Sequence, residues 1–289
     1  MAPLSLASLV YSADVAVAYL LHGPGLVAAF FAVTSLFSVA SEVFLYGFRY
    51  LHSFVLSTGR HASAVRAVRL AAFVAAPLLV YAAVYPGYYI HVVNPSYLWA
   101  AGAAPLAAYA SLATLVGNGL GQVVYGLVRE RGIAAAGRLA KISSLYLLPS
   151  VVYISVEYLG LVYSRGADRD AILAWGTAFL AMSAARLLVP VLAMRWLLPG
   201  RLGGVVRDVL ACMVLYPAAA VLAALAFPPA GPPQPRFWDT LGVLAQPVLK
   251  TYALYTLLVL TADRSVRESA TRIAKNIPAI ARSWRKVPH

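Results

Sequence analysis

Cysteine and acidic side chains are both scarce in this chain. Among its 289 residues there is one cysteine, Cys212, and there are only 10 aspartates and glutamates against 23 lysines and arginines. A single cysteine excludes an intramolecular disulfide framework and a thiolate metal site. The five histidines are scattered through the sequence without the spacing of metal ligands, so we expect neither a metal nor a cofactor.

The catalytic motifs of several membrane enzymes are also missing. The sequence has no H-E-x-x-H, no G-x-S-x-G and no G-x-x-x-x-G-K-[ST], motifs that mark zinc hydrolysis, acyl transfer and phosphate binding. It has no loop with the paired aspartates that would hold Mg²⁺ for prenyl-diphosphate chemistry. We therefore expect that the protein is not an enzyme.

What the sequence has in abundance is apolar residues. They make up 62% of the chain, only 11% of residues are charged, and the mean hydropathy is +0.77. A soluble domain of this size needs far more polar surface, so the composition predicts an all-α polytopic membrane protein. The net charge of +13 then indicates contact with anionic lipid headgroups rather than with nucleic acid.

About eight segments have the roughly 20 apolar residues that a membrane-spanning helix needs. They lie near 3–21, 25–48, 66–85, 98–124, 142–163, 171–196, 206–227 and 238–262. The first has no basic leader or cleavage site, which favours a membrane helix over a removed signal. We therefore expect a transmembrane bundle over 1–262. The basic tail at 263–289 spaces its apolar residues as an interfacial amphipathic helix does.

Charge alternates between successive loops. The basic loops are the ones after the second, fourth, sixth and eighth spans, and they contain Arg49, Arg60, Arg66 and Arg69, then Arg129, Arg131, Arg138 and Lys141, then Arg195, Arg201 and Arg207, and finally the tail. The intervening loops, such as "HGPG" and "PPAGPPQPR", are nearly bare of lysine and arginine. The positive-inside rule predicts a multi-pass protein of the cell membrane with both termini in the cytoplasm.

Five charged residues lie more than one helical turn inside the predicted spans. They are Asp14, Glu42, Glu157, Arg186 and Lys250. Such groups are costly in lipid and usually face protein or water. The sequence allows a hydrated cavity with paired charges, structural ion pairs between helices, or snorkelling to the interface, which is easiest for Glu157.

The stretch "GNGLGQ" at 117–122 adds amides and glycines to an apolar span. Asn118 and Gln122 would hydrogen-bond a polar substrate if this helix lines a cavity, and the glycines would permit close approach. The alternative is a seam of small residues between packed helices. Prolines also fall within six spans, at Pro77, Pro105, Pro149, Pro190, Pro217 and Pro247. They are typical either of a bundle that bends or of membrane helices in general.

Several stretches, in order, resemble the second half of polysaccharide flippases in the MATE-like (multidrug/oligosaccharidyl-lipid/polysaccharide) exporter superfamily. "SADVAVAYLLHGPGLVAAFF" is similar to their opening helix pair, in which an acid in the first helix matches Asp14. "TGRHASAVRAVRLAAFVAAPLLVYAAVY" resembles the following basic loop and proline-containing helix. "LKTYALYTLLVLTADRSVRESATRIAKNI" resembles the last helix and its charged exit. Members have two lobes, whereas this chain corresponds to the second lobe and the terminal helix pair.

The resemblance implies alternating-access flipping of a lipid-linked oligosaccharide or polysaccharide precursor, by a half-transporter that needs a second copy or a second multi-helix lobe. On this hypothesis Arg186 and Lys250 attract the substrate's phosphate or acidic sugars. Asp14 and Glu42 pair with them or exchange a cation or proton. Two alternatives stay open: a cation-coupled multidrug exporter of the same superfamily, and a non-transporting membrane scaffold subunit.

Overall fold

The computed structural model describes residues 13–129, 132–198, 202–234, 236–269 and 271, and every regular element in these ranges is a helix. The all-α prediction is thereby confirmed. Seven helical segments are long and apolar enough to cross a membrane: Pro24–Thr58, His61–Val84, Pro95–Leu127, Ile133–Tyr163, Asp168–Leu197, Gly203–Ala226 and Phe237–Ala262. They correspond to seven of the eight predicted spans, and the chain is a multi-pass membrane protein. Most of the eighth, 3–21, lies outside the described residues.

The elements in chain order are α2 (Asp14–His22), α3 (Pro24–Thr58), α4 (His61–Val84), α5 (Pro86–Val93), the 3₁₀ helix η1 (Pro95–Ala103), α6 (Ala104–Leu127), α7 (Ile133–Ser144), α8 (Leu147–Tyr163), α9 (Asp168–Leu197), α10 (Leu202–Leu210), the π-helix η2 (Ala211–Leu215), α11 (Tyr216–Ala226) and α12 (Phe237–Ala262). The bare connection after α4, read from sequence as a loop, is therefore mostly helical. Three spans are also divided: one between the 3₁₀ helix η1 and α6, one between α7 and α8, and one by the π turn between α10 and α11.

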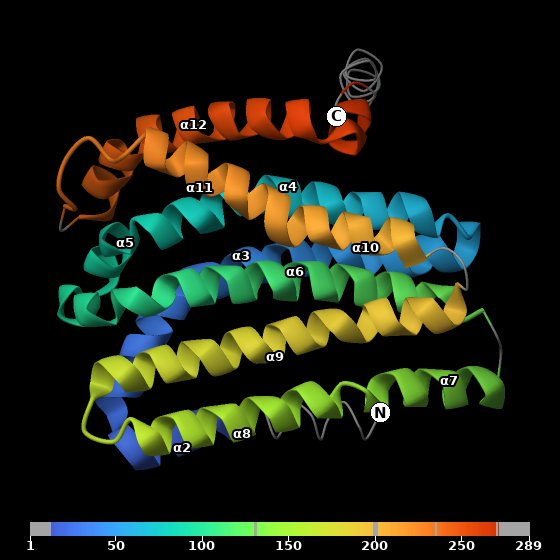
Figure 1. Cartoon of the computed structure of the whole chain (residues 1–289), viewed down its shortest axis with the longest axis horizontal. Coiled ribbons are helices and arrows are strands. Elements are labelled where there is room, and N and C mark those ends of the chain that lie inside the picture. Colours follow the sequence, from blue (N-terminus) through green and yellow to red (C-terminus); the bar gives the residue numbers. More distant parts are fainter. Residues whose placement is uncertain (1–12, 130–131, 199–201, 235, 270, 272–289) are drawn as a thin grey trace, which may run out of the picture.

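The connections alternate between two ends of the bundle (Figure 1). The α3–α4, α6–α7 and α9–α10 connections and the end of α12 lie at the right of that view, and they carry the arginine-rich loops. We call this the basic end. The α2–α3, α4–α5, α8–α9 and α11–α12 connections lie at the opposite, bare end. This gathering of charge agrees with the alternation in the sequence.

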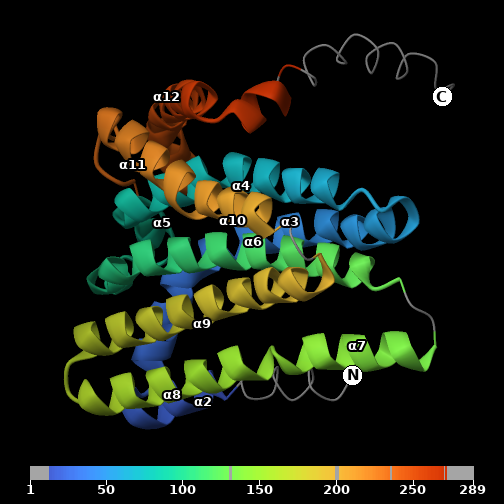
Figure 2. The same cartoon turned by 45° about the vertical axis from the view of Figure 1, so that its right-hand side comes forward.

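Helix α6 occupies the middle of the bundle (Figure 2), and it packs most extensively against α9 and α3 and then against α4. Its small residues permit that packing. A Cβ on Gly117 would lie 3.3 Å from the Cα of Leu187 on α9, and a Cβ on Gly119 would lie 2.6 Å from a methyl group of Val68 on α4. The glycines of "GNGLG" thus form close helix contacts, as the seam interpretation predicted.

Two of the prolines leave backbone carbonyls that a neighbouring helix satisfies. Pro77 cannot donate to the carbonyl of Phe73, which instead accepts a 2.9 Å hydrogen bond from the Tyr255 hydroxyl of α12. Pro217 likewise leaves the carbonyl of Met213, which accepts a hydrogen bond from the hydroxyl of Tyr109 on α6. In lipid an unpaired carbonyl is costly, so each bond fixes a proline-containing helix to its neighbour.

The packing of α6 gives a first prediction. Gly119→Ala should lower the free energy of unfolding by about 1–3 kcal/mol, because the new methyl group would overlap a valine that has little rotamer freedom in a helix. Gly137→Ala on α7 is the matched control, since its Cβ would have nothing within 4 Å, and it should be neutral or stabilising. Thermal denaturation in detergent compares the two variants. Equal stability of both would contradict the seam.

Candidate functional site

The structure separates the six residues that the sequence singled out. Glu42 and Lys250 lie near the middle of α3 and α12, and both are on exposed faces of the described chain. Asp14 begins α2 and is buried, at 6% exposed. In Figure 1, α2 and α12 lie at opposite edges of the bundle. Asp14 and Lys250 therefore belong to different regions and do not form one charge-paired cavity.

The other three residues lie on facing sides of α6 and α9. The hydroxyl of Thr114 on α6 hydrogen-bonds the hydroxyl of Ser183 on α9 at 3.1 Å. Asn118 follows Thr114 by one turn, Gln122 by two, and Arg186 follows Ser183 by nearly one, so helical spacing places them along the same interface. All three are half-buried. They form a polar strip in otherwise close packing.

A second polar cluster, which sequence reasoning missed, lies at the basic end. Arg69 of α4 is only 6% exposed, and it donates to the carboxylates of Asp208 on α10 and Asp263 after α12. Its Nε also donates to the Tyr216 hydroxyl at 2.8 Å, and that hydroxyl donates to Asp263 at 2.8 Å. One guanidinium thus binds two carboxylates and joins three segments that are distant in sequence.

The Arg69 cluster also determines the protonation of Asp263. Burial opposes ionisation of this carboxyl, but the hydrogen bonds from Arg69 and Tyr216 outweigh it and hold the pKa of Asp263 below its usual 3.8. Its other oxygen accepts a 2.9 Å hydrogen bond from the backbone N–H of Ser265, which begins the next helical turn. The ionised carboxylate therefore both pairs with Arg69 and starts that turn.

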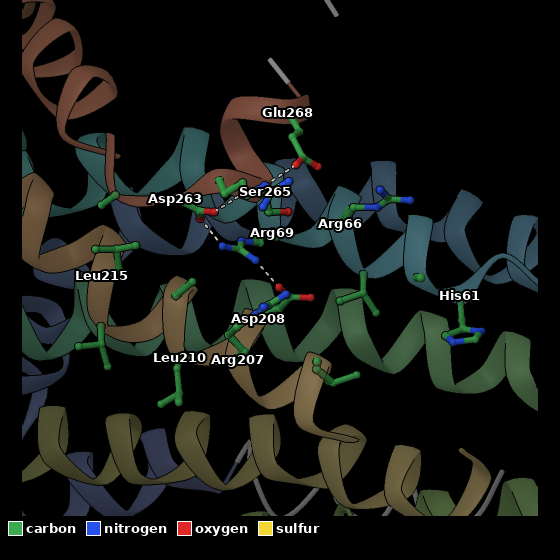
Figure 3. A pocket seen from close by; sticks show the side chains of 18 of the residues that line it. His61, Arg66, Arg69, Arg207, Asp208, Leu210, Leu215, Asp263, Ser265 and Glu268 are labelled. Atoms are coloured by element: carbon green, nitrogen blue, oxygen red, sulfur yellow. Dashed lines mark hydrogen bonds and ion pairs between the residues drawn. The ribbon is translucent and has the colours of Figure 1, made fainter. Parts of the chain in front are cut away.

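Beside this cluster is a pocket of about 1280 Å³, lined by α4, α10, η2 and the segment after α12 (Figure 3). Four arginines line it: Arg66, Arg69, Arg207 and Arg264. Asp208 and Asp263 both pair with Arg69, and Glu268 pairs with Arg264 at 2.8 Å, so the four arginines and three acids of the lining sum to a net charge of +1. Arg66 and Arg207 are both exposed, and among the described residues neither forms an ion pair. These two cations remain for an anionic ligand.

The same pocket continues into an apolar strip. Leu210, Val214 and Ala218 line it at successive turns of the α10–η2–α11 segment, and all three are exposed. A cationic mouth at the basic end and an apolar strip along a span suit a ligand with a phosphate head and a hydrocarbon tail. The π turn that contributes to the wall is a feature often found at functional sites.

Two signals in the sequence could have indicated this cluster. Asp208 is the one acid between 171 and 238, and Asp263 is the one acid between 240 and 267. Both occur where a span meets a basic loop, in a chain with few acids, which is a setting in which a carboxylate pairs with a nearby cation. The partner was missed because Arg69 was counted with the basic loop, although the predicted span near 66–85 already contained it and α4 begins still earlier, at His61.

A third polar group lies toward the bare end. Glu157 of α8 is fully buried, which shows that the snorkelling interpretation was wrong for this residue.

Within the described residues, clusters of three or more histidine, cysteine, aspartate or glutamate side chains suited to a metal are absent. No protein-family model, curated protein or solved structure matches this chain.

The Arg69 cluster leads to a stability prediction. Arg69→Met should cost about 3–5 kcal/mol of unfolding free energy, because it leaves two carboxylates without their buried cation. Arg66→Met is the control on the same helix. Because the Arg66 side chain is exposed, this substitution should change the free energy of unfolding by less than about 0.5 kcal/mol. Thermal or denaturant unfolding in detergent measures both changes. Similar losses for the two variants would contradict a structural role for the cluster.

Acidification should weaken the same cluster. Because the pKa of Asp263 is lowered in the folded state, its contribution is complete above its usual 3.8 and is lost as the pH falls below that value. The wild-type melting temperature should therefore drop on acidification through this range. The melting temperature of Asp263→Asn should be lower than that of the wild type at neutral pH and should fall less steeply on acidification. Thermal unfolding across a pH series measures both. An equally steep drop in the variant would refute this assignment.

Proposed function

We propose that this chain is a membrane transport subunit that translocates an anionic, lipid-linked substrate, and that the pocket at the basic end receives its phosphate group. The observation that carries the proposal is the combination in one pocket of two uncompensated arginines, Arg66 and Arg207, with an exposed apolar strip. A guanidinium binds phosphate oxygens with directional hydrogen bonds. The strip would accommodate the start of the lipid chain.

The substrate class that fits best is a lipid-linked oligosaccharide or polysaccharide precursor. The polar strip of Asn118, Gln122 and Arg186 provides amide and guanidinium groups deep in the bundle, where sugar hydroxyls or acidic sugars would need them. If the basic end faces the cytoplasm of the cell membrane, as the positive-inside rule predicts, the pocket would load substrate where such precursors are assembled. A multidrug exporter for cationic compounds is a poorer fit with a pocket that has two uncompensated arginines.

A second lobe is part of this proposal. Glu42 and Lys250 are exposed near the middle of membrane-spanning helices, and a charged group facing lipid at that depth costs a few kcal/mol. A second copy of the chain or another multi-helix protein would cover these faces and complete the transport path. This is how a half-transporter of the MATE-like kind would work.

The scaffold alternative is favoured by one specific observation. Arg69 is fully engaged by Asp208, Asp263 and Tyr216, an arrangement that joins helices and needs no substrate. The two functions differ at Arg66 and Arg207, which a purely structural role would leave unused. Substitution of Arg66 and Arg207 therefore distinguishes a transport subunit from a scaffold.

The test is binding of a polyprenyl phosphate to the purified protein in detergent. Polyprenyl phosphate should raise the wild-type melting temperature, and Arg66→Gln with Arg207→Gln should weaken the apparent affinity about 30-fold, at about 1 kcal/mol for each cation. The matched control is Arg165→Gln with Arg169→Gln, which removes the same charge at the bare end. It should leave binding unchanged.

Two comparisons make this experiment decisive. Inorganic phosphate should stabilise the protein much less than polyprenyl phosphate does, because it lacks the chain that would lie on the apolar strip. Equal affinity of the wild type and the Arg66/Arg207 double variant for polyprenyl phosphate would overturn the proposal and favour the scaffold.

A further inference from the structure

The buried carboxyl group of Glu157 has a setting that the basic pocket does not explain. Glu157 is fully buried, and within the described part of the chain neither of its carboxyl oxygens has a hydrogen-bond partner. A charged carboxylate in that environment would lack both water and a counter-ion, which costs many kcal/mol. At membrane depth such a group is stable as the neutral acid.

Helix α2 places a second carboxyl group on the same interface. Asp14 accepts a 2.7 Å hydrogen bond from the hydroxyl of Tyr153 on α8, and Tyr153 lies one turn before Glu157 on the same face. One turn beyond Glu157, the carbonyl of Leu161 lies 2.9 Å from Nε2 of His22 on α2. The two helices therefore run alongside each other in the same direction from Asp14 to His22, with Glu157 between these contacts.

The two carboxyl groups differ in the hydrogen bonds that they receive. Asp14 accepts from Tyr153 and from the backbone N–H of Val15 at 2.6 Å. Tyr153 in turn accepts a 2.9 Å hydrogen bond from the indole N–H of Trp175 on α9, which aligns its own proton toward Asp14. Donors stabilise a carboxylate, and a carboxyl group without donors favours the neutral form. A single proton shared by this pair would therefore be held by Glu157.

The surroundings keep this pair dry and in place. Trp175 is fully buried and stacks on Phe30 of α3 with a centroid distance of 3.9 Å. A Cβ on Gly160 would lie only 2.8 Å from the Cβ of Ala174, so α8 and α9 are in close contact beside the site. Apolar packing thus excludes water and leaves protonation as the means of neutralising Glu157.

Titratable side chains also lead from the pair to the bare end. His22 has a side chain that is only 2% exposed, and its Nδ1 lies 3.7 Å from a carboxylate oxygen of Asp168, whose side chain is 65% exposed. Nε2 faces the Leu161 carbonyl and must carry a proton to donate to it, which leaves Nδ1 directed toward Asp168. Asp14, Tyr153, His22 and Asp168 are the titratable groups that α2, α8 and α9 place around or near Glu157.

We propose that Glu157, paired with Asp14 at the α2–α8 interface, is a proton-binding site within the membrane that exchanges its proton toward the bare end. Proton uptake converts the Glu157 carboxylate to the neutral acid, and release returns the proton to water, with no other bond made or broken. That this proton drives substrate movement rests on the proposed function. Proton binding itself does not.

The test is infrared difference spectroscopy of the full chain in nanodiscs, recorded without substrate as the pH is raised from neutral. The wild type should lose the carbonyl stretch of a protonated carboxylic acid. Glu157→Gln should lack that band, since the amide imitates the neutral acid and should preserve the fold. Glu157→Met also removes the carboxyl group and is a second variant that should lack the band. Glu42→Gln on the exposed face of α3 is the matched control and should retain the band.

Asp14→Asn identifies which carboxyl group holds the proton. The band should persist in this variant. A wild type without the band, or a band that survives in both Glu157 variants, or one that disappears in Asp14→Asn while it remains in Glu157→Gln, would overturn the proposal. Because no polyprenyl phosphate is added, this outcome is independent of whether the basic pocket binds its substrate.

Discussion

A polar group buried in the bilayer is costly unless the chain itself satisfies it, and that constraint explains most of the tertiary contacts, with Glu157 as an exception among the described residues. The carbonyls left by Pro77 and Pro217 are bonded by Tyr255 and Tyr109, which connects α4 to α12 and η2 to α6. The guanidinium of Arg69 is neutralised by carboxylates from two other segments. Hydrophobic burial drives little of this association in lipid, so these bonds and the glycine contacts of α6 determine the arrangement.

The local features of the fold follow from the sequence, and the long-range pairs do not. Hydropathy and loop charge located seven spans and the two ends of the bundle, because each depends on residues that are close in the chain. The partners of Arg69 are 139 and 194 residues away. Which helices meet depends on packing between surfaces, and a single sequence has no direct signal for it.

The same limit applies to the candidate sites. Depth within a span marked Asp14, Glu157 and Arg186 as residues to explain, but it missed the Arg69 cluster and could not tell a lipid-facing residue from a buried one. Lys250 occupies the middle of α12 on an exposed face, whereas Glu157 is fully buried nearer the end of α8. Helical periodicity distinguishes such faces poorly when nearly every neighbour is apolar.

The two polar sites lie in different parts of the bundle, and that separation suits a transport subunit. The pocket lies between α4 and the α10–α11 segment at the basic end, and the Asp14–Glu157 pair lies between α2 and α8, closer to the bare end. Central helix α6 packs against both α4 and α9. A change at either site could therefore reach the other through the α6 interfaces, which is the physical requirement for coupling between them.

The most direct test of this account is the native mass of the protein extracted from its membrane in nanodiscs, with identification of the lipids that remain bound. The account predicts a dimer, or a complex with a second multi-helix protein, that retains a polyprenyl phosphate or a sugar precursor linked to one. A monomer, or a complex that retains only the bulk phospholipids of the membrane, would contradict it.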